Sequence, residues 1–315
     1  MELKYLNGQQ VSEMLDMKVC IDLMKGIFTA FAEGKMENKL RQVFPVDTGK
    51  VFGIMPAVIP TEEVCGAKLI TAFHTNHAKG LPSHLGVVAV FSNDDGQLLG
   101  LCDGTAITAI RTAAVSAVAT DLMARKDSST MCLIGGGVQA TMHMEALTLV
   151  RDIRNVTVWC PTLSESEKFC EKHSILYPDI KFTAYAECED AVKDADIICT
   201  VTPSSTPVLM GRWVKEGAHI NAVGACSKTA RELDSECTAK GRLFCDNYDS
   251  CRNEAGDYLF PLNEGLITEE HLLADLAEVL SGKVTARESE KDITIFESQG
   301  LACEDVVCAA WLLKQ

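Results

Sequence analysis

Three small residues in the middle of the chain have the types and spacing of a nucleotide-binding turn. Gly135, Gly137 and Ala140 match the pattern G-x-G-x-x-A. They follow the apolar residues 131–134, which predict a strand, and they open a helical pattern that begins near Val138. The first glycine permits a tight turn, the second lets backbone approach phosphates, and the alanine keeps the helix close to the strand. The helix N-terminus adds free N–H groups and partial positive charge. We therefore expect a dinucleotide site, although glycine turns also occur for purely steric reasons.

Two cations lie in segments that are otherwise apolar. Lys68 falls within residues 64–73, which predict a strand, and Arg111 falls within an alanine-rich helical pattern over 105–126. An uncompensated charge in apolar surroundings is costly. A guanidinium binds carboxylate in a bidentate fork, and a desolvated lysine has a lowered pKa and exchanges protons near neutral pH. The alternatives are a surface arginine on a helix and a strand lysine that faces solvent.

Arg41 is a second candidate for binding a carboxylate, but its polar surroundings are equally typical of a surface residue. No metal site is expected, because no cysteine or carboxylate at ligand spacing supports His74, His77 and His84.

The segments before the glycine turn predict a helix and an antiparallel sheet. Residues 17–33 have helical periodicity behind Asp16 as a cap. A hairpin turn at 93–96 joins two of the expected strands. Pro56 and Pro60 are expected to mark breaks. The predicted strands are 51–59, 64–73, 86–92 and 97–103.

After the turn, short apolar strands alternate with helical or irregular segments. This alternation predicts a parallel, doubly wound sheet. The later expected strands are 155–160, 181–186, 195–202, 219–224, 242–247 and 292–298, before a closing helix at 304–314.

The composition is that of an ordinary globular protein, with 47% hydrophobic and 23% charged residues in a chain long enough for two domains. A net charge of −15 disfavours nucleic acid and anionic membranes as partners. The N-terminus lacks the apolar core of a signal peptide, and no apolar run approaches the roughly 20 residues of a membrane span. Fourteen cysteines without C-x-x-C spacing are expected to be reduced and mostly buried, so we expect a cytoplasmic protein.

The chain resembles the ornithine cyclodeaminase/mu-crystallin family over nearly its whole length. The segments that carry this resemblance are 107–114, 133–140 and 294–302, with 81–84 and 219–225 in addition. The resemblance implies an α/β protein in which a Rossmann domain, a doubly wound parallel sheet, is inserted into a mixed or antiparallel α+β domain. The Rossmann domain would comprise residues 121–299. Residues 1–120 and 300–315 would bind substrate and form a homodimer through their sheet.

The resemblance also implies a bound nicotinamide cofactor and hydride transfer at the carbon between an amine or imine nitrogen and a carboxylate. It assigns substrate contacts to Arg41, Met55, Lys68 and Arg111, with Lys68 and the two arginines as catalytic residues. Met55 is equally explained by packing. Implied cofactor contacts, beside Gly135, Gly137 and Ala140, are Ser83, Thr112, Val138, Gln139, Cys160, Thr162, Thr202, Val223, Gly224, Cys226 and Gly300.

Two departures from the family pattern bear on the chemistry. Cys160-Pro161-Thr162 lacks both the acid that would bind the ribose hydroxyls of NAD and the arginine that would bind a 2′-phosphate, and we favour NADP(H). Cys226 replaces the aspartate of cyclodeaminases and alanine dehydrogenases, and Gly53 replaces a cyclodeaminase glutamate. Mu-crystallin-like reductases instead share the run 231–234.

The leading hypothesis is an NAD(P)-dependent reductase or dehydrogenase that acts at the α-carbon of a small imino or amino acid, such as a cyclic ketimine. One alternative is ornithine cyclodeaminase, which converts ornithine to proline and ammonia with NAD and without net turnover. Another is a non-catalytic nucleotide-binding protein, against which the retention of Lys68, Arg41 and Arg111 argues.

Overall fold

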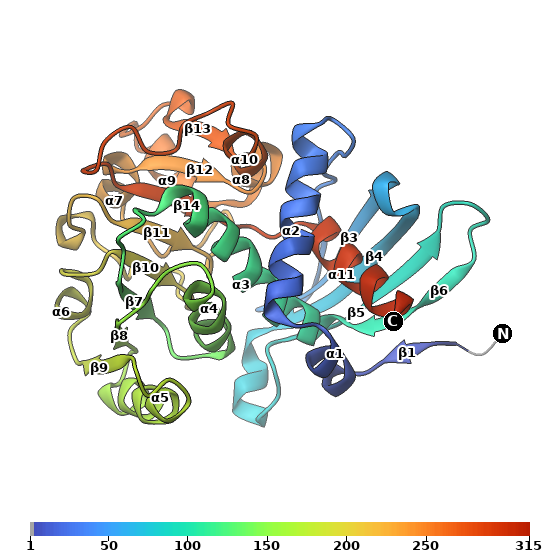
Figure 1. Ribbon diagram of the computed structural model, residues 1–315, viewed down its shortest axis with the longest axis horizontal. Helices are drawn as coiled ribbons and strands as arrows, with labels where there is room; N and C mark the ends of the chain where they lie inside the picture. Colours follow the sequence, from blue (N-terminus) through green and yellow to red (C-terminus); the bar gives the residue numbers. More distant parts are fainter. Residues whose placement is uncertain (1–2) are drawn as a thin grey trace. The chain divides into compact units, whose positions relative to one another are not determined.

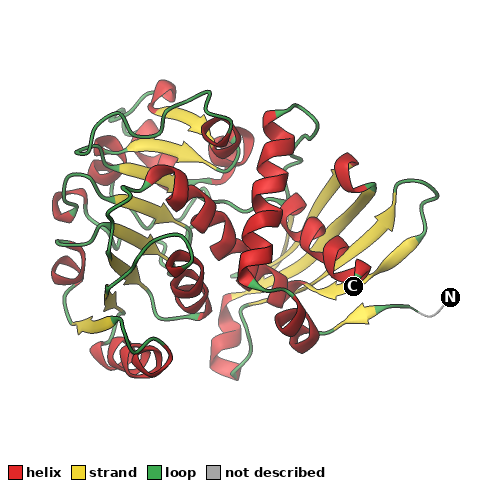
Figure 2. Ribbon diagram, viewed as in Figure 1, coloured by secondary structure: helices red, strands yellow, loops and turns green. Residues whose placement is uncertain are grey.

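The computed structural model describes residues 3–315, apart from the side chains of His74, His77 and Ala78. The chain divides into two compact units. One comprises Met1–Ala114 with Gly300–Gln315, and the other comprises Val115–Gln299. The boundary expected at residue 120 lies further along the same helix, α3 (Gly104–Met123). Figure 1 follows the chain through both units, and Figure 2 separates helices from strands.

The first unit is built on a six-stranded sheet in the order β1-β6-β5-β4-β3-β2. All neighbouring strands are antiparallel except β1 and β6. Helix α11 packs against β3, β4, β5 and β6. The strands are β1 (Tyr5–Leu6), β2 (Gln42–Asp47), β3 (Lys50–Ile59), β4 (Val64–Phe73), β5 (His84–Ser92) and β6 (Leu98–Asp103). The helices are α1 (Gly8–Met14), α2 (Met17–Ala32), α11 (Ala302–Lys314) and the 3-10 helices η1 (Pro60–Glu62) and η2 (His74–Lys79).

Two local expectations for this unit need correction. Pro56 does not break β3. It pairs with Ala67 of β4 on one side, and on the other side β2 ends at the register of Ile54, so no residue of β2 lies opposite Pro56. A proline is tolerated in a strand where no neighbour needs its missing N–H. Strand β2 was not predicted, because its residues are exposed on both faces and lack an apolar alternation. Asp16 does cap α2 as predicted, by accepting backbone N–H groups of the first turn.

Helix α3 differs from the expectation that no segment has the length of a membrane span. By length and composition it is the one helix among the described residues that is long and apolar enough. However, 67% of its most apolar window is buried inside the structure. A buried core helix passes the same test, so the length of α3 carries no argument for a membrane.

The second unit contains an eight-stranded parallel sheet in the order β13-β12-β14-β11-β10-β7-β8-β9, which confirms the predicted fold class. The strands are β7 (Thr130–Ile134), β8 (Asn155–Trp159), β9 (Lys181–Tyr185), β10 (Ile197–Thr200), β11 (His219–Ala222), β12 (Arg242–Cys245), β13 (Leu272–Asp275) and β14 (Thr294–Glu297). The helices are α4 (Val138–Thr148), α5 (Leu163–Leu176), α6 (Cys188–Val192), α7 (Ser235–Lys240), α8 (Tyr248–Glu254), α9 (Gly256–Asn263), α10 (Leu276–Leu280), η3 (Gly211–Trp213) and η4 (Glu269–His271).

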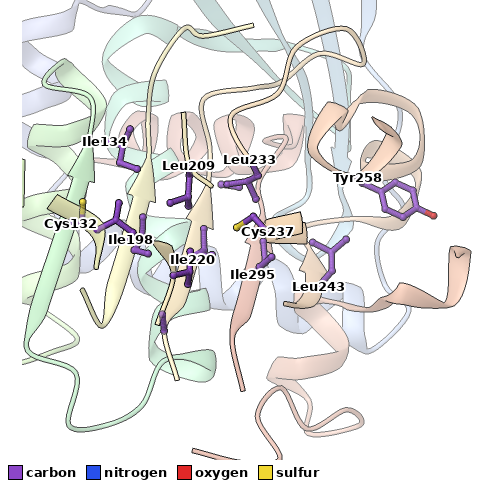
Figure 3. Close-up of a cluster of buried hydrophobic side chains, with 14 of the residues drawn as sticks. Cys132, Ile134, Ile198, Leu209, Ile220, Leu233, Cys237, Leu243, Tyr258 and Ile295 are labelled. Atoms are coloured by element: carbon purple, nitrogen blue, oxygen red, sulfur yellow. The ribbon is translucent and has the colours of Figure 1, made fainter. Parts of the chain in front are cut away.

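One face of this sheet carries the apolar core of the unit. Ile134, Ile198, Ile220 and Ile295 come from four neighbouring strands, and all four are fully buried (Figure 3). β-branched side chains on adjacent parallel strands pack into a continuous layer, and this layer holds the carboxyl ends of the strands beside one another. Loops that follow those carboxyl ends form the usual ligand-binding edge of an open parallel sheet.

The cysteines form no disulfide among the described residues, and most of them are buried. Cys226 is the exposed one. The described residues also contain no cluster of three or more His, Cys, Asp or Glu side chains that would hold a metal ion. The side chains of His74 and His77 lie outside the described residues.

Candidate functional site

The glycine turn follows β7 and is tied to the neighbouring strands. Gly135 has φ +113° and donates its N–H to the carbonyl oxygen of Trp159 at 2.8 Å. A Cβ at Gly135 would lie 2.9 Å from the carbonyl oxygen of Val201. A side chain here would be strained and would also clash, so the turn requires glycine. Ala140 is fully buried, as its expected role in close helix–strand packing demands.

The next two glycines differ in their surroundings. A Cβ at Gly136 would lie 2.8 Å from Sγ of Cys160, whereas a Cβ at Gly137 would meet no atom within 4 Å. Gly137 is the N-cap of α4 and provides no side-chain cap. Val138, an apolar residue at the helix start, is 66% exposed, and Gln139 beside it is half-buried. Open space therefore lies beside uncapped N–H groups, and this arrangement fits a dinucleotide pyrophosphate.

A buried carboxylate that sequence reasoning did not single out joins the loops after β10 and β11. Oε1 of Glu232 accepts the N–H and the hydroxyl of Thr202, each at 2.6 Å, and Oε2 accepts the N–H of Gly224 at 2.7 Å. A Cβ at Gly224 would lie 2.2 Å from the carbonyl oxygen of Thr202. Glu232 thus brings together two residues predicted to contact the cofactor, at the ligand-binding edge of the sheet.

A second buried acid holds Glu232 in turn. Oδ1 of Asp257 accepts the N–H groups of Glu232 at 2.9 Å and Leu233 at 2.6 Å. Burial, together with the nearby charge of Glu232, raises the pKa of Asp257 to about 8. Burial also raises the pKa of Glu232, but its donors from Thr202 and Gly224 oppose that rise. With a pKa of about 8, Asp257 carries a proton at neutral pH, and Glu232 accepts three hydrogen bonds.

The remaining predicted cofactor residues of this unit lie near the same edge. Val223 is buried, and the thiol of Cys226 donates to its carbonyl oxygen at 3.4 Å. Cys160 is buried against the glycine turn. Thr162 is the N-cap of α5, and its hydroxyl donates to Oε2 of Glu165 at 3.0 Å. Glu165 is an acid that the sequence analysis did not consider.

The first unit buries a separate cluster of charges beneath α11. Lys68 is 1% exposed, and its Nζ lies 2.7 Å from Oδ2 of Asp305. The Nζ also donates to the hydroxyl of Thr108 at 3.3 Å. Met55 pairs with Lys68 across β3 and β4 and is buried as well. Lys68 therefore does not face solvent, and its charge is compensated by Asp305.

Arg111 belongs to the same cluster. Its Nη1 lies 2.6 Å from Oε2 of Glu304, and its Nε lies 3.1 Å from Oδ1 of Asp305. Gly300 has φ +77°, and a Cβ there would lie 2.5 Å from Nη1 of Arg111. Nη2 of Arg41 donates to the carbonyl oxygen of Gly300 at 2.9 Å. Gly300 thus makes room for Arg111 and holds Arg41 close by.

The electrostatics of the cluster suit proton exchange. Burial lowers the pKa of Lys68 to about 8, and the charges of Arg111 and Arg41 act in the same direction while Asp305 opposes them. Burial would raise the pKa of Asp305, but Arg111 and Lys68 hold it below its ordinary value. The lysine is therefore poised near neutral pH beside a carboxylate that stays ionised.

The structure brings Arg41, Lys68, Arg111 and Gly300 together, with Met55 beside Lys68. The hydroxyl of Ser83 hydrogen-bonds Nδ1 of His84 at 2.9 Å. Thr112 is buried in α3, next to Arg111 in the chain.

Glu304 and Asp305, the counter-ions of the cluster, were not predicted as site residues. Both are fully buried. The available signal was two adjacent acids in a helix that is otherwise apolar, which is the same argument that singled out Arg111.

Three comparisons show which known proteins this chain resembles. A sequence profile of the ornithine cyclodeaminase/mu-crystallin family matches residues 2–315. The ketimine reductase mu-crystallin of Mus musculus is 38% identical over 283 residues, which cover 90% of this chain and 86% of that protein. The Delta(1)-pyrroline-2-carboxylate reductase of Thermococcus litoralis, in complex with NADH and L-proline, is 35% identical with a TM-score of 0.95, covering 98% of this chain and 96% of that one. An archaeal alanine dehydrogenase dimer with bound NAD is 30% identical with a TM-score of 0.93, covering 100% and 96% of the two chains. This chain belongs to the ornithine cyclodeaminase/mu-crystallin family.

Proposed function

We propose that this protein is an NAD(P)H-dependent reductase of small cyclic 2-imino carboxylates. The observation that carries the proposal is the buried cluster of Lys68, Arg111, Glu304 and Asp305 with Arg41 beside it. This group brings two guanidinium groups and the ammonium of Lys68 to one place, and a guanidinium binds a carboxylate in a bidentate fork. Relatives that reduce ketimines and pyrroline-2-carboxylate support this substrate class.

The residues of this chain divide the work. Arg111 and Arg41 bind the substrate carboxylate, and a guanidinium does so with fixed geometry. Lys68 is mostly protonated at neutral pH, because its pKa of about 8 lies above it. The lysine donates that proton to the imine nitrogen as the nitrogen becomes an amine. When bound, the reduced nicotinamide supplies the hydride that the imine carbon receives.

The direct test is turnover by the purified protein. We expect NADH or NADPH to be consumed with pyrroline-2-carboxylate or piperideine-2-carboxylate, with proline or pipecolate formed. The assay also includes pyruvate with ammonia or with amines. No consumption of either cofactor with any of these substrates would overturn the proposal. Release of proline and ammonia from ornithine with catalytic NAD would support a cyclodeaminase in its place.

We further propose that the preferred cofactor is NAD(H), which reverses the preference inferred from Cys160, Pro161 and Thr162. Glu165 places a carboxylate at the loop after β8, held by the Thr162 hydroxyl at 3.0 Å. The end of β8 lies beside the glycine turn, since a Cβ at Gly136 would lie 2.8 Å from Cys160 Sγ. A ribose in this loop would bring a 2′-phosphate close to Glu165, and the like charges would repel each other.

Cofactor binding tests this preference without turnover. We expect fluorescence titration to show that NADH binds more tightly than NADPH. Glu165→Gln should lower the ratio of the NADPH and NADH dissociation constants by about fivefold, as for an exposed charge. Glu167→Gln, on the same exposed helix, is the matched control and should leave the ratio unchanged. Tighter binding of NADPH by the unchanged protein would contradict the assignment.

We also propose that the protein is a homodimer that uses the face of the six-stranded sheet opposite α11. Met55 and Lys68 are buried on the α11 face, whereas Val58, Leu69 and Phe91 alternate with such positions and are at least 36% exposed. An exposed apolar face of this kind marks an interaction surface. Analytical ultracentrifugation should show a dimer, and Leu69→Asp should shift it towards monomer. A monomeric unchanged protein would contradict the proposal.

A further inference from the structure

We propose that Asp305 is a positioning residue of the reaction, which keeps Lys68 in its proton-donating form and directs Arg111 towards the substrate carboxylate. This inference rests on the proposed reductase function. It concerns a residue of α11 that acts through two side chains on other elements, Lys68 on β4 and Arg111 on α3.

The two oxygens of Asp305 have separate tasks. Oδ2 lies 2.7 Å from Nζ of Lys68, and Oδ1 lies 3.1 Å from Nε of Arg111. Thr108 lies at the same point, where its hydroxyl donates to the carbonyl oxygen of Gly104 at 2.7 Å and accepts from Lys68 at 3.3 Å. One fully buried carboxylate therefore orients the lysine and one edge of the guanidinium at once.

The charges around Lys68 make Asp305 decisive for its proton. From α3, Arg111 disfavours the charged lysine, and from the segment before β2, Arg41 does the same, in addition to burial. From α11, Asp305 opposes these effects through its charge and its hydrogen bond. Asp305 itself stays ionised, because Arg111 and Lys68 lower its pKa despite burial. Without this carboxylate, Lys68 would be largely neutral at neutral pH.

The proton balance of the step is simple. The ammonium of Lys68 loses one proton, an N–H bond forms at the imine nitrogen, and the imine carbon receives a hydride from the reduced cofactor. Asp305 neither gives nor receives a proton. The neutral lysine regains its proton from water before the next turnover.

Glu304 is a matched control that the chain itself provides. It is adjacent to Asp305, has the same charge and is also fully buried. Its ion pair goes to Nη1 of Arg111 at 2.6 Å. Glu304→Gln therefore removes an equal charge next to the same arginine and leaves the Lys68–Asp305 contact in place.

The pH dependence of kcat and of kcat/KM for pyrroline-2-carboxylate reduction tests the proposal. For Asp305→Asn we expect the alkaline limb of the pH profile to move about two pH units lower and the rate at neutral pH to fall about tenfold. For Glu304→Gln we expect a higher KM for the imino acid and an unmoved limb. An unmoved limb in Asp305→Asn, or an equal shift in Glu304→Gln, would overturn the proposal.

A titration of Lys68 itself separates this inference from the proposed function. In ¹⁵N-lysine-labelled holoenzyme, with the signal assigned through Lys68→Arg, the midpoint should be lower in Asp305→Asn than in the unchanged protein. Asp305→Glu restores the charge and should restore the midpoint, which serves as a second test if the asparagine variant folds poorly. Inactivity of the unchanged protein would reject the reductase function, whereas equal midpoints in all variants would reject the role of Asp305.

Discussion

The two units bury acids in opposite ways. In the first unit, Asp305 and Glu304 face the cations Lys68 and Arg111 at 2.6–3.1 Å. In the second unit, Glu232 accepts two backbone N–H groups and one hydroxyl, and Asp257 accepts two more backbone N–H groups. The first arrangement keeps mobile protons and full charges close to one another. In the second arrangement, main-chain N–H groups donate to the carboxylate oxygens. These hydrogen bonds fix the loops and leave little charge for chemistry.

This difference has an energetic consequence. A buried ion pair is expensive to desolvate, and removal of one partner costs roughly 3–5 kcal/mol because the other charge is left unpaired. Hydrogen bonds from backbone N–H groups to a carboxylate contribute about 1.5–3 kcal/mol each. We infer that the first cluster is retained for reactivity and the second for the shape of the cofactor-binding edge.

The largest expected effect is in the first cluster. Lys68→Ala should lower the turnover number by about 100-fold or more, because a general acid contributes that range. The dissociation constant for the dinucleotide should stay unchanged, since the glycine turn belongs to the other unit. Steady-state rates and fluorescence titrations measure the two quantities. Lys50→Ala is the control, because Lys50 pairs with Asp47 at the exposed end of the same sheet. A near-normal rate in Lys68→Ala would reduce the first cluster to a structural ion pair.

A smaller effect, of the opposite kind, is expected from Glu232. Glu232→Gln loses one acceptor and turns an amide N–H₂ towards the N–H of Gly224 or towards Thr202. We expect the dissociation constant for the cofactor to rise about tenfold, equivalent to ~1.4 kcal/mol, with kcat at saturating cofactor close to normal. Glu236→Gln, which removes an exposed pair with Lys240, should change neither quantity. A fall in kcat without a change in cofactor affinity would contradict the proposed division between the clusters.

The smallest effect concerns Asp257 and appears as a pH dependence of stability. Its pKa in the folded protein, about 8, lies above the ordinary value of 3.8. Between these two pH values the folded protein holds a proton on Asp257 that the unfolded chain has released. The stability contribution is therefore complete below the ordinary pKa and is lost as the pH rises towards about 8. Asp257→Asn keeps an oxygen for the N–H groups of Glu232 and Leu233 but has no proton to lose.

We therefore expect Asp257→Asn to flatten the decline of the unfolding temperature with pH and to be the more stable form in alkaline solution by about 1 kcal/mol, or a few degrees. Burial raises the pKa of Glu297 as well, so some slope should remain. Calorimetry of both proteins over a pH series measures the effect. Parallel curves would show that Asp257 is ionised in the folded protein.

Local patterns in the sequence were sufficient for most of the fold. The apolar strands at 51–59 and 64–73, the helix behind Asp16, and the strand, glycine turn and helix from residue 131 onwards all correspond to elements of the structure. Apolar periodicity and capping act over a few residues, and this is why they are readable. Strand β2 and strand β13 were not readable, because pairing with a neighbouring strand, rather than the composition of the segment itself, makes each of them a strand.

The candidate site divides along the same line. Lys68, Arg111 and the glycine turn were identifiable from residue type in an unusual local context, since a charge in an apolar segment or three glycines at a strand end need a reason. What each charge faces was not identifiable. Asp305 lies 237 positions after Lys68 in the chain, and Glu232 lies 30 after Thr202 and 8 after Gly224.

By itself the sequence determined the class of fold, the place of the dinucleotide turn and two of the cations that the chemistry needs. The tertiary structure alone decided that Lys68 shares a carboxylate with Arg111, and that Gly300 leaves room for that arginine. It also decided that Glu232 joins two strand ends. The physical reason is that burial and ion pairing depend on distances between atoms far apart in the chain, and these distances exist only after the sheets and α11 have packed.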